Sequence, residues 1–238
     1  MKRSAAFFLI ALALGAIILA PGAGAQAQGP TEIEKCQTIS HPGSYKLVNN
    51  LTFTGTTGTC LTIAASSVNI DLAGFTISGP GGTGTTAIAA GNDTTGIAVR
   101  NGSISGFFVG VALGGNGSIV EGLRVLGFPC PCLLGIGATG VVKGNTVLGI
   151  AGFPGQGTGI SATGIVTGNY ATGSRFAGIE IGQGSTVIGN TATGNRGGPG
   201  IGIFVNCPSN VTDNTAVNNT SNLELFGEGC HNEDNVAP

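Results

Sequence analysis

Short runs in which apolar residues occupy every second position recur through most of the chain. The segments VNIDL (68–72) and IGIFV (201–205) are two examples. A period of two places alternate side chains on opposite sides of an extended strand, whereas a helix repeats every ~3.6 residues. Leu and long charged helix formers are scarce beyond the N-terminal segment, which argues against helices there. The pattern therefore predicts many short strands with one buried side.

These strands belong to a repeat. The phrase VVKGNTVLGI (141–150) returns three times, and its shared asparagines, 24, 21 and 24 residues apart, are Asn145, Asn169, Asn190 and Asn214. Degraded copies place Gly122-Leu123 and Asn101-Gly102 at the corresponding position. A second phrase, Gly followed by Ile or Val, recurs at Gly96, Gly110, Gly135, Gly159, Gly178 and Gly200. Repeats of this length with two or three strands each predict a parallel β-helix of about seven turns, and not a propeller or a leucine-rich repeat.

The repeated phrase has a structural explanation. Equivalent residues of successive turns stack about 4.8 Å apart, so asparagines at one position form a ladder of side-chain amides. Asn tolerates the left-handed conformation of a sharp turn, and the preceding Gly takes backbone angles that are costly for other residues. The valines just upstream should stack inside as core; these are Val142, Val166, Val187 and Val211. We therefore interpret the phrase as scaffold.

The N-terminal segment is distinct from the repeat. Lys2 and Arg3 precede an apolar run at residues 5–20, and small residues then allow cleavage after Ala25 or Ala27. This order predicts a secretory signal peptide over residues 1–27, with an uncleaved anchor as the alternative. The mature chain of about 210 residues fits one β-rich domain. We expect a secreted or periplasmic monomer with no membrane segment after signal removal.

The charge is low and close to balanced. Charged residues make up 8% of the chain, the formal net charge is −2, and glycine is frequent, at 45 residues. The chain has no basic stripe, so it lacks the electrostatic footprint of a nucleic-acid-binding protein. Neither the composition nor the motifs point to a cofactor or a metal, and we expect none.

Six cysteines in an exported chain suggest disulfides. Cys36 with Cys60 and Cys207 with Cys230 each bracket a plausible loop at one end of the repeat. Cys130 and Cys132 could be a redox or metal dithiol, or could form a local or cross-turn disulfide, and we favour the disulfide. An open solenoid end needs a cap. We therefore assign residues 28–66 to an N-terminal cap, 67–220 to the turns and 221–238 to a C-terminal cap and tail.

Several segments of the chain resemble a known group of proteins. The segments CQTISHPGSYKLVNNL, CLTIAASSVNIDLAGFTISG and GIAVRNGSISGF, followed by serial GNTATGN units, resemble right-handed parallel β-helix proteins of the pectin-lyase-like superfamily. More narrowly, they resemble its secreted, uncharacterised bacterial members. The likeness covers Cys36 to Cys230 and implies an all-β, single-stranded, right-handed coil. It does not imply one activity, because this scaffold serves lyases, hydrolases and adhesins.

The motifs of the enzymes in that superfamily are missing. The N-T-D, D-D, G-H-G and R-I-K motifs of polygalacturonases are not present, and both histidines, His41 and His231, lie in the expected caps. The stacked acidic residues with which pectate lyases bind calcium are also absent, since acids are thin along the turns. These absences count against a catalyst without excluding one.

One charged group remains a candidate for chemistry. Arg100, Glu121 and Lys143 should stack outward on three successive turns, with Arg124 a few residues beyond Glu121. They could hold a uronate carboxylate and supply an Arg or Lys base for β-elimination. Alternatively, they form exposed ion pairs of roughly 0–1 kcal/mol each, which we favour.

These observations lead to one preferred function and two alternatives. We expect a non-catalytic scaffold, with polysaccharide or another surface as its partner. The main alternative is a polysaccharide lyase or other carbohydrate-active enzyme acting on an acidic glycan, and only that alternative would bring in calcium. A cell-envelope adhesin is a weaker third possibility.

Overall fold

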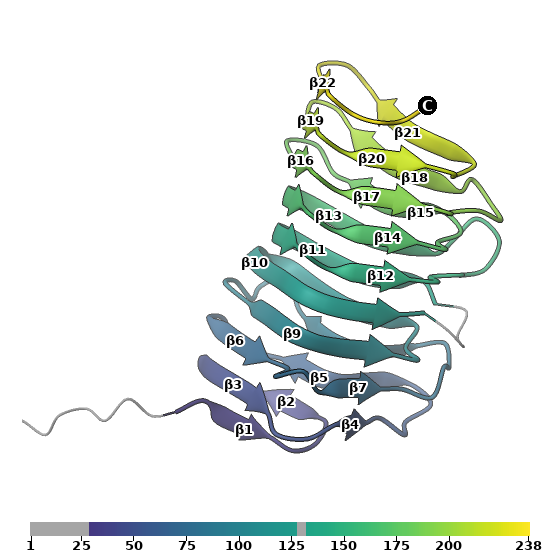
Figure 1. Ribbon diagram of the computed structural model, residues 1–238. Helices are drawn as coiled ribbons and strands as arrows, with labels where there is room; N and C mark the ends of the chain where they lie inside the picture. The colour runs from purple at the N-terminus through teal and green to yellow at the C-terminus, as the bar shows by residue number, and fades with distance from the viewer. Residues whose placement is uncertain (1–28, 128–131) are drawn as a thin grey trace, which may run out of the picture.

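The computed structural model describes residues 29–127 and 132–238 (Figure 1). The predicted signal peptide and Cys130 therefore lie outside the described residues. Within them, 22 strands and no helix form one parallel β-solenoid of about 8 turns, which confirms the predicted fold class. The right-handed sense of the coil stays a prediction.

The strands stack into three faces along the axis, which we call face A, face B and face C. Face A contains β1 (Thr31–Ile33), β3 (Gly43–Leu47), β6 (Val68–Asp71), β16 (Thr186–Ile188), β19 (Asn210–Thr212) and β22 (His231–Glu233). Face B contains β4 (Leu51–Thr52), β7 (Thr76–Ser78), β12 (Thr146–Leu148), β14 (Tyr170–Thr172), β17 (Thr191–Thr193) and β20 (Thr215–Val217). Face C contains β2 (Gln37–Ile39), β5 (Gly58–Ile63), β8 (Thr85–Ala90), β15 (Ala177–Ile181), β18 (Ile201–Asn206) and β21 (Ser221–Phe226).

Four longer strands in the middle of the coil pass from one face to the next. β9 (Ala98–Ser105) runs from face A to face B, and β10 (Val109–Leu126) runs through faces C, A and B. β11 (Leu134–Lys143) and β13 (Thr158–Thr167) each run from face C to face A. The register still shifts within β10, between Leu113 on face C and Ser118 before face A.

The core is a set of stacked columns of aliphatic side chains. In face A, equivalent valines of successive turns are direct strand partners with no exposed surface; they are Val120, Val142, Val166, Val187 and Val211. Their neighbours in sequence point outward, as the period of two requires. A coil of this kind has no separate core per turn, since each turn buries its apolar side chains on the next.

The coil has about 8 turns, where about seven were predicted, and the segments expected as caps contribute strands to it. β1 to β5 lie in the segment assigned to the N-terminal cap, and each pairs in parallel with the next turn. At the other end, β21 pairs with β18 and β22 with β19. The turns at both ends therefore continue the coil with less regular sequences.

The two predicted end disulfides are confirmed. Cys36 is bonded to Cys60 with a Cα–Cα distance of 4.5 Å, and Cys207 to Cys230 with 5.0 Å. Cys132 is also disulfide-bonded, whereas Cys130 lies outside the described residues. Such bonds suggest an oxidising compartment, either extracellular or periplasmic. Among the residues that the structure describes, no helix is long and apolar enough to cross a membrane.

A ladder of asparagine side chains lines the short turn between faces A and B. The amide nitrogen of Asn145 donates to Oδ1 of Asn169 at 3.0 Å, and Asn169 donates to Asn190 at 2.9 Å. Asn190 donates to Asn214 at 3.0 Å, and the ladder then continues to Asn235 at 2.8 Å. Asparagine thus satisfies buried backbone and side-chain groups on successive turns, which keeps this turn at constant length.

The left-handed conformation expected for the ladder asparagines is adopted by the residue before each of them. Gly144, Gly168 and Gly189 have φ between 62° and 64°, and Asp213 takes the same place with φ 58°. The Asn side chain must reach the adjacent turn, so the tight reversal is made by the residue before it. Glycine accepts these angles without steric cost, which explains its place in the phrase.

The second repeated phrase was misaligned at two of its positions. Ile179 pairs with Ile203, so Gly202, and not Gly200, is the equivalent of Gly178. Gly96 is also outside the column, since Val111 pairs with Ile88. From β9 onwards the turn from face A to face B has constant length, whereas the connection from face B to face C varies. Alignment on the phrase alone therefore lost the register there.

Candidate functional site

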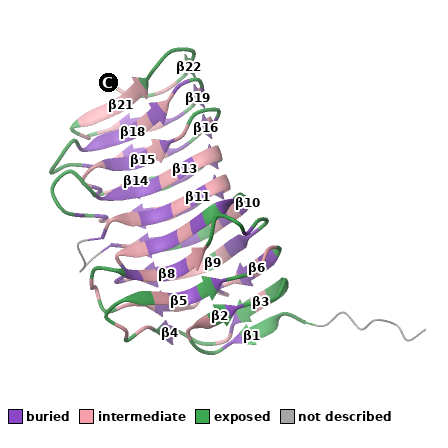
Figure 2. Cartoon of the chain, turned by 180° about the vertical axis from the view of Figure 1, so that it is seen from behind, coloured by how far each residue is buried: buried purple, intermediate pink, exposed green. Residues whose placement is uncertain are grey.

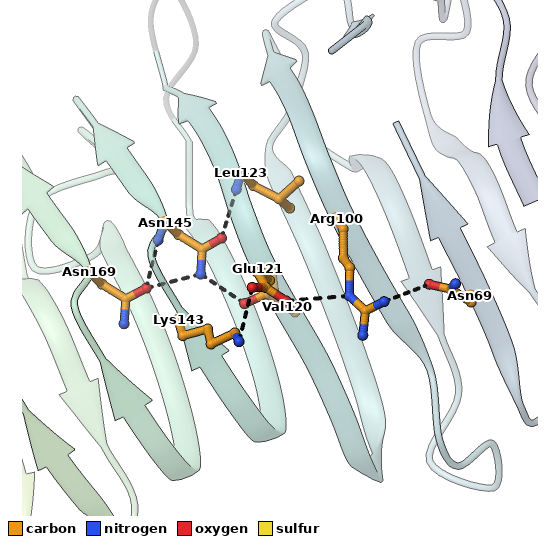
Figure 3. A network of polar contacts seen from close by, with 8 residues as sticks. All are labelled: Asn69, Arg100, Val120, Glu121, Leu123, Lys143, Asn145 and Asn169. Carbon is orange, nitrogen blue, oxygen red and sulfur yellow. Dashed lines mark hydrogen bonds and ion pairs between the residues drawn. The ribbon is translucent and has the colours of Figure 1, made fainter. Parts of the chain in front are cut away.

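The charged residues singled out in the sequence form a column on face A (Figure 3). Arg100 and Glu121 are direct strand partners, as are Glu121 and Lys143. Glu121 Oε1 lies 3.0 Å from Lys143 Nζ, and its Oε2 lies 3.4 Å from Arg100 Nε. Arg100 also donates from Nη1 to Oδ1 of Asn69 at 3.5 Å. One carboxylate is therefore shared by a cation from each adjacent turn.

The column continues towards the N-terminus with alternating sign. Asp71 is the strand partner of Arg100, Lys46 of Asp71, and Glu32 of Lys46. Sequence analysis missed this extension because the turns there differ in length from the repeats around Asn145. Towards the C-terminus the column passes through the uncharged Thr167, Ile188 and Thr212 and reaches Glu233 on the last turn.

Arg124 does not join this column. It follows Glu121 by three residues, but the turn intervenes, so it lies on face B with Ser103 and Thr146 as strand partners. Its side chain is exposed there. The structure therefore brings together three of the four charged candidates on face A and places Arg124 on face B.

The geometry of the column suits ion pairing better than acid–base chemistry. The side chains of Arg100, Glu121 and Lys143 are 34%, 35% and 45% exposed, so water screens their charges. The cationic groups of Arg100 and Lys143 both contact the carboxylate of Glu121. Arg100, Glu121 and Lys143 do not line the two depressions that offer a hollow for a sugar ring.

A hollow of that kind lies on face C. Two adjoining depressions share Leu113, Gly114 and Gly137 and together form a groove across β8, β10, β11, β13, β15 and β18. These strands follow one another along the axis in the rear view of Figure 2. The floor consists of short outward side chains at equivalent positions; they are Ala89, Ala112, Gly137 and Ser161. The absence of bulky groups at these positions produces the groove.

Polar groups gather towards the C-terminal end of this groove. Hydroxyls of Thr139, Ser161 and Thr163 line it, together with the amide of Asn206 and the carboxylate of Glu180. Glu180 is the one charged residue among its described lining residues. Thr158 donates from Oγ1 to Glu180 Oε2 at 3.3 Å, which orients the carboxylate. The groove can therefore accept many weak hydrogen bonds along an extended polar ligand.

Beyond Ser161 the same column of strand partners continues through an acid, an aromatic residue and a second acid. Glu180 pairs with Phe204, and Phe204 pairs with Glu224 on the next turn. The ring of Phe204 stacks against that of Phe226, with centroids 6.3 Å apart, and Phe226 is 67% exposed. Correct alignment of the Gly-Ile phrase could have revealed this column. The two-residue error places Gly202 where Phe204 lies.

A metal-ligating cluster is not found in the described parts of the chain, where no three His, Cys, Asp or Glu side chains are grouped suitably. His231 contacts Glu233 at 3.3 Å on the exposed face A strand β22. Comparisons with protein-family models, with curated proteins and with solved structures give no match.

Proposed function

We propose that this protein is an exported, non-catalytic β-solenoid that binds a polysaccharide along the groove of face C. The observation that carries the proposal is the groove itself, which crosses several turns and is lined by short side chains and hydroxyls. Ligand sites are concave, with a few placed polar groups. An elongated groove fits a chain-like ligand.

The scaffold supports this function physically. A groove built on continuous parallel strands is rigid, so little conformational entropy is lost when a ligand binds. The end disulfides are in keeping with work outside the reducing cytosol. Our proposal includes membership in the pectin-lyase-like superfamily and a right-handed coil, both carried by the motifs of the sequence.

The alternative function, a polysaccharide lyase on face A, has less support. Its candidate bases are Arg100, Arg124 and Lys143, of which Arg124 is on another face and the other two share Glu121. β-Elimination needs a base that can take a proton from the sugar carbon next to the carboxylate. The ion pairs favour a structural role for this column.

A panel of acidic and neutral polysaccharides tests both functions at once. The purified protein is incubated with each glycan, with and without calcium, and both co-sedimentation and newly formed chain ends are measured. We expect binding without new chain ends. Release of chain ends that vanishes when Arg100, Glu121 and Lys143 are all replaced would establish the lyase instead.

Two variants locate the binding site. Ser161→Tyr places a bulky ring on the groove floor and should abolish co-sedimentation, while Thr167→Tyr, on face A, serves as the matched control. Both variants are compared with the parent protein by thermal unfolding. Equal loss of binding in the two variants would contradict the groove as the site.

A further inference from the structure

The column Glu180–Phe204–Glu224 has the composition of a cation site. Its members are strand partners on three consecutive turns, so the Cα atoms of the two acids lie one turn, about 5 Å, on either side of that of Phe204. A cation over an aromatic face is attracted by the electron density of the ring. A carboxylate on each side adds charge-assisted hydrogen bonds.

These acids lack internal neutralisation. Within residues 29–127 and 132–238, neither Glu180 nor Glu224 forms an ion pair with a Lys, Arg or His side chain. Glu180 accepts one hydrogen bond from Thr158, which still leaves acceptor positions open on its carboxylate. Glu121 on face A, by contrast, forms ion pairs with two cations. The negative charge at this end of the groove is thus available to a ligand.

We propose that the groove selects a glycan carrying protonated amines, that is, a polymer of amino sugars, and that Glu180, Phe204 and Glu224 recognise one amine. This inference rests on the proposed polysaccharide-binding function. A glucosamine unit presents an ammonium beside the apolar C–H face of its sugar ring, so the ammonium can pair with the acids while that face packs on Phe204 and Phe226. A polyuronate brings its own carboxylates and is repelled by the same residues.

The experiment compares ligands of one length and linkage by isothermal titration calorimetry. The exported protein, with its disulfides intact, is titrated with glucosamine oligomers, fully N-acetylated oligomers, polygalacturonate oligomers and a polylysine peptide. We expect the glucosamine oligomer to bind most tightly and its affinity to fall as salt is added. Glu180→Gln with Glu224→Gln should weaken this ligand about tenfold and leave the acetylated oligomer unchanged.

Two further variants separate recognition from folding. Phe204→Leu keeps the apolar bulk without a ring and should weaken the glucosamine oligomer several-fold. Glu121→Gln removes one carboxylate from face A and should change no affinity. All variants are checked for the parent β-sheet circular dichroism spectrum.

The possible outcomes distinguish failure of the amine proposal from failure of the proposed polysaccharide binding. Equal affinity for aminated and acetylated oligomers, or an unchanged affinity in the double variant, overturns the amine proposal while polysaccharide binding stands. Preferred binding of the polyuronate overturns it as well. Binding of polylysine without binding of any glycan overturns both this inference and the proposed function.

Discussion

Faces A and C of the same coil each present a column of charged residues, but the columns differ in what lies one turn away. On face A, acids and bases alternate from Glu32 to Lys143, and each of the contacts to Glu121 is an ion pair. On face C, Glu180 and Glu224 are separated by Phe204 and remain unpaired with any described cation. In a parallel solenoid, the residue on the next turn therefore decides whether a charge is neutralised internally or is offered to a ligand.

The two columns also differ in how much they contribute to the stability of the fold. Exposed pairs such as those of Glu121 contribute roughly 0–1 kcal/mol each, so the face A column adds little stability and no binding site. The face C acids form no ion pair with a described cation, and Glu180 accepts one hydrogen bond, from Thr158. Two carboxylates without a cation partner add no ion-pair stability to the fold, and such residues are common at binding sites.

The largest expected effect tests the coil that carries both columns. Asn190 is fully buried, and its side chain bridges Asn169 and Asn214. Asn190→Ala leaves several buried groups unsatisfied and should lower the free energy of unfolding by about 3 kcal/mol. Denaturant unfolding followed by circular dichroism measures this change.

Thr193→Ala, on the outer side of face B, is the matched control and should cost less than about 0.5 kcal/mol. At a temperature where the protein is folded, Asn190→Ala should bind glycan like the parent. A loss of stability as small as that of the control would mean that the ladder is not needed to hold the turn.

The next prediction converts the face C column into the face A pattern. Phe204→Lys places a cation between Glu180 and Glu224, which neutralises both and removes the ring. Affinity for the glucosamine oligomer should fall more than tenfold, because the substituted ammonium competes with that of the ligand. Calorimetric titration against Phe204→Leu measures the difference, and retained affinity in the Lys variant would refute the role of the column.

The smallest expected effect comes from unpairing face A. Glu121→Gln leaves Arg100 and Lys143 without their shared carboxylate, and the free energy of unfolding should fall by at most about 1 kcal/mol. Added salt should shrink this difference, since the groups are exposed. A loss of several kcal/mol in denaturant titration would show that the column is a structural element of the fold, not a surface feature.

From β9 onwards the turn between faces A and B has constant length, and the sequence could predict what depends on it. Asn145, Asn169 and Asn190 follow the outward residue at a fixed distance, so the Arg100–Glu121–Lys143 column could be aligned without a structure. Face C follows a connection of variable length, and one misassigned Gly-Ile pair hid the partnership of Glu180 and Phe204. The groove was equally hidden, because it arises from the side chains that are small at matching positions on different turns.

The most direct test of the central claim is a map of the bound glycan on the protein. Isotope-labelled protein is titrated with the glucosamine oligomer, and changes in backbone amide chemical shifts are recorded by nuclear magnetic resonance. We predict that the largest changes lie on face C, around Ser161, Glu180, Phe204 and Glu224, with face A unaffected. Changes centred on Arg100, Glu121 and Lys143, or spread evenly over all three faces, would contradict the account.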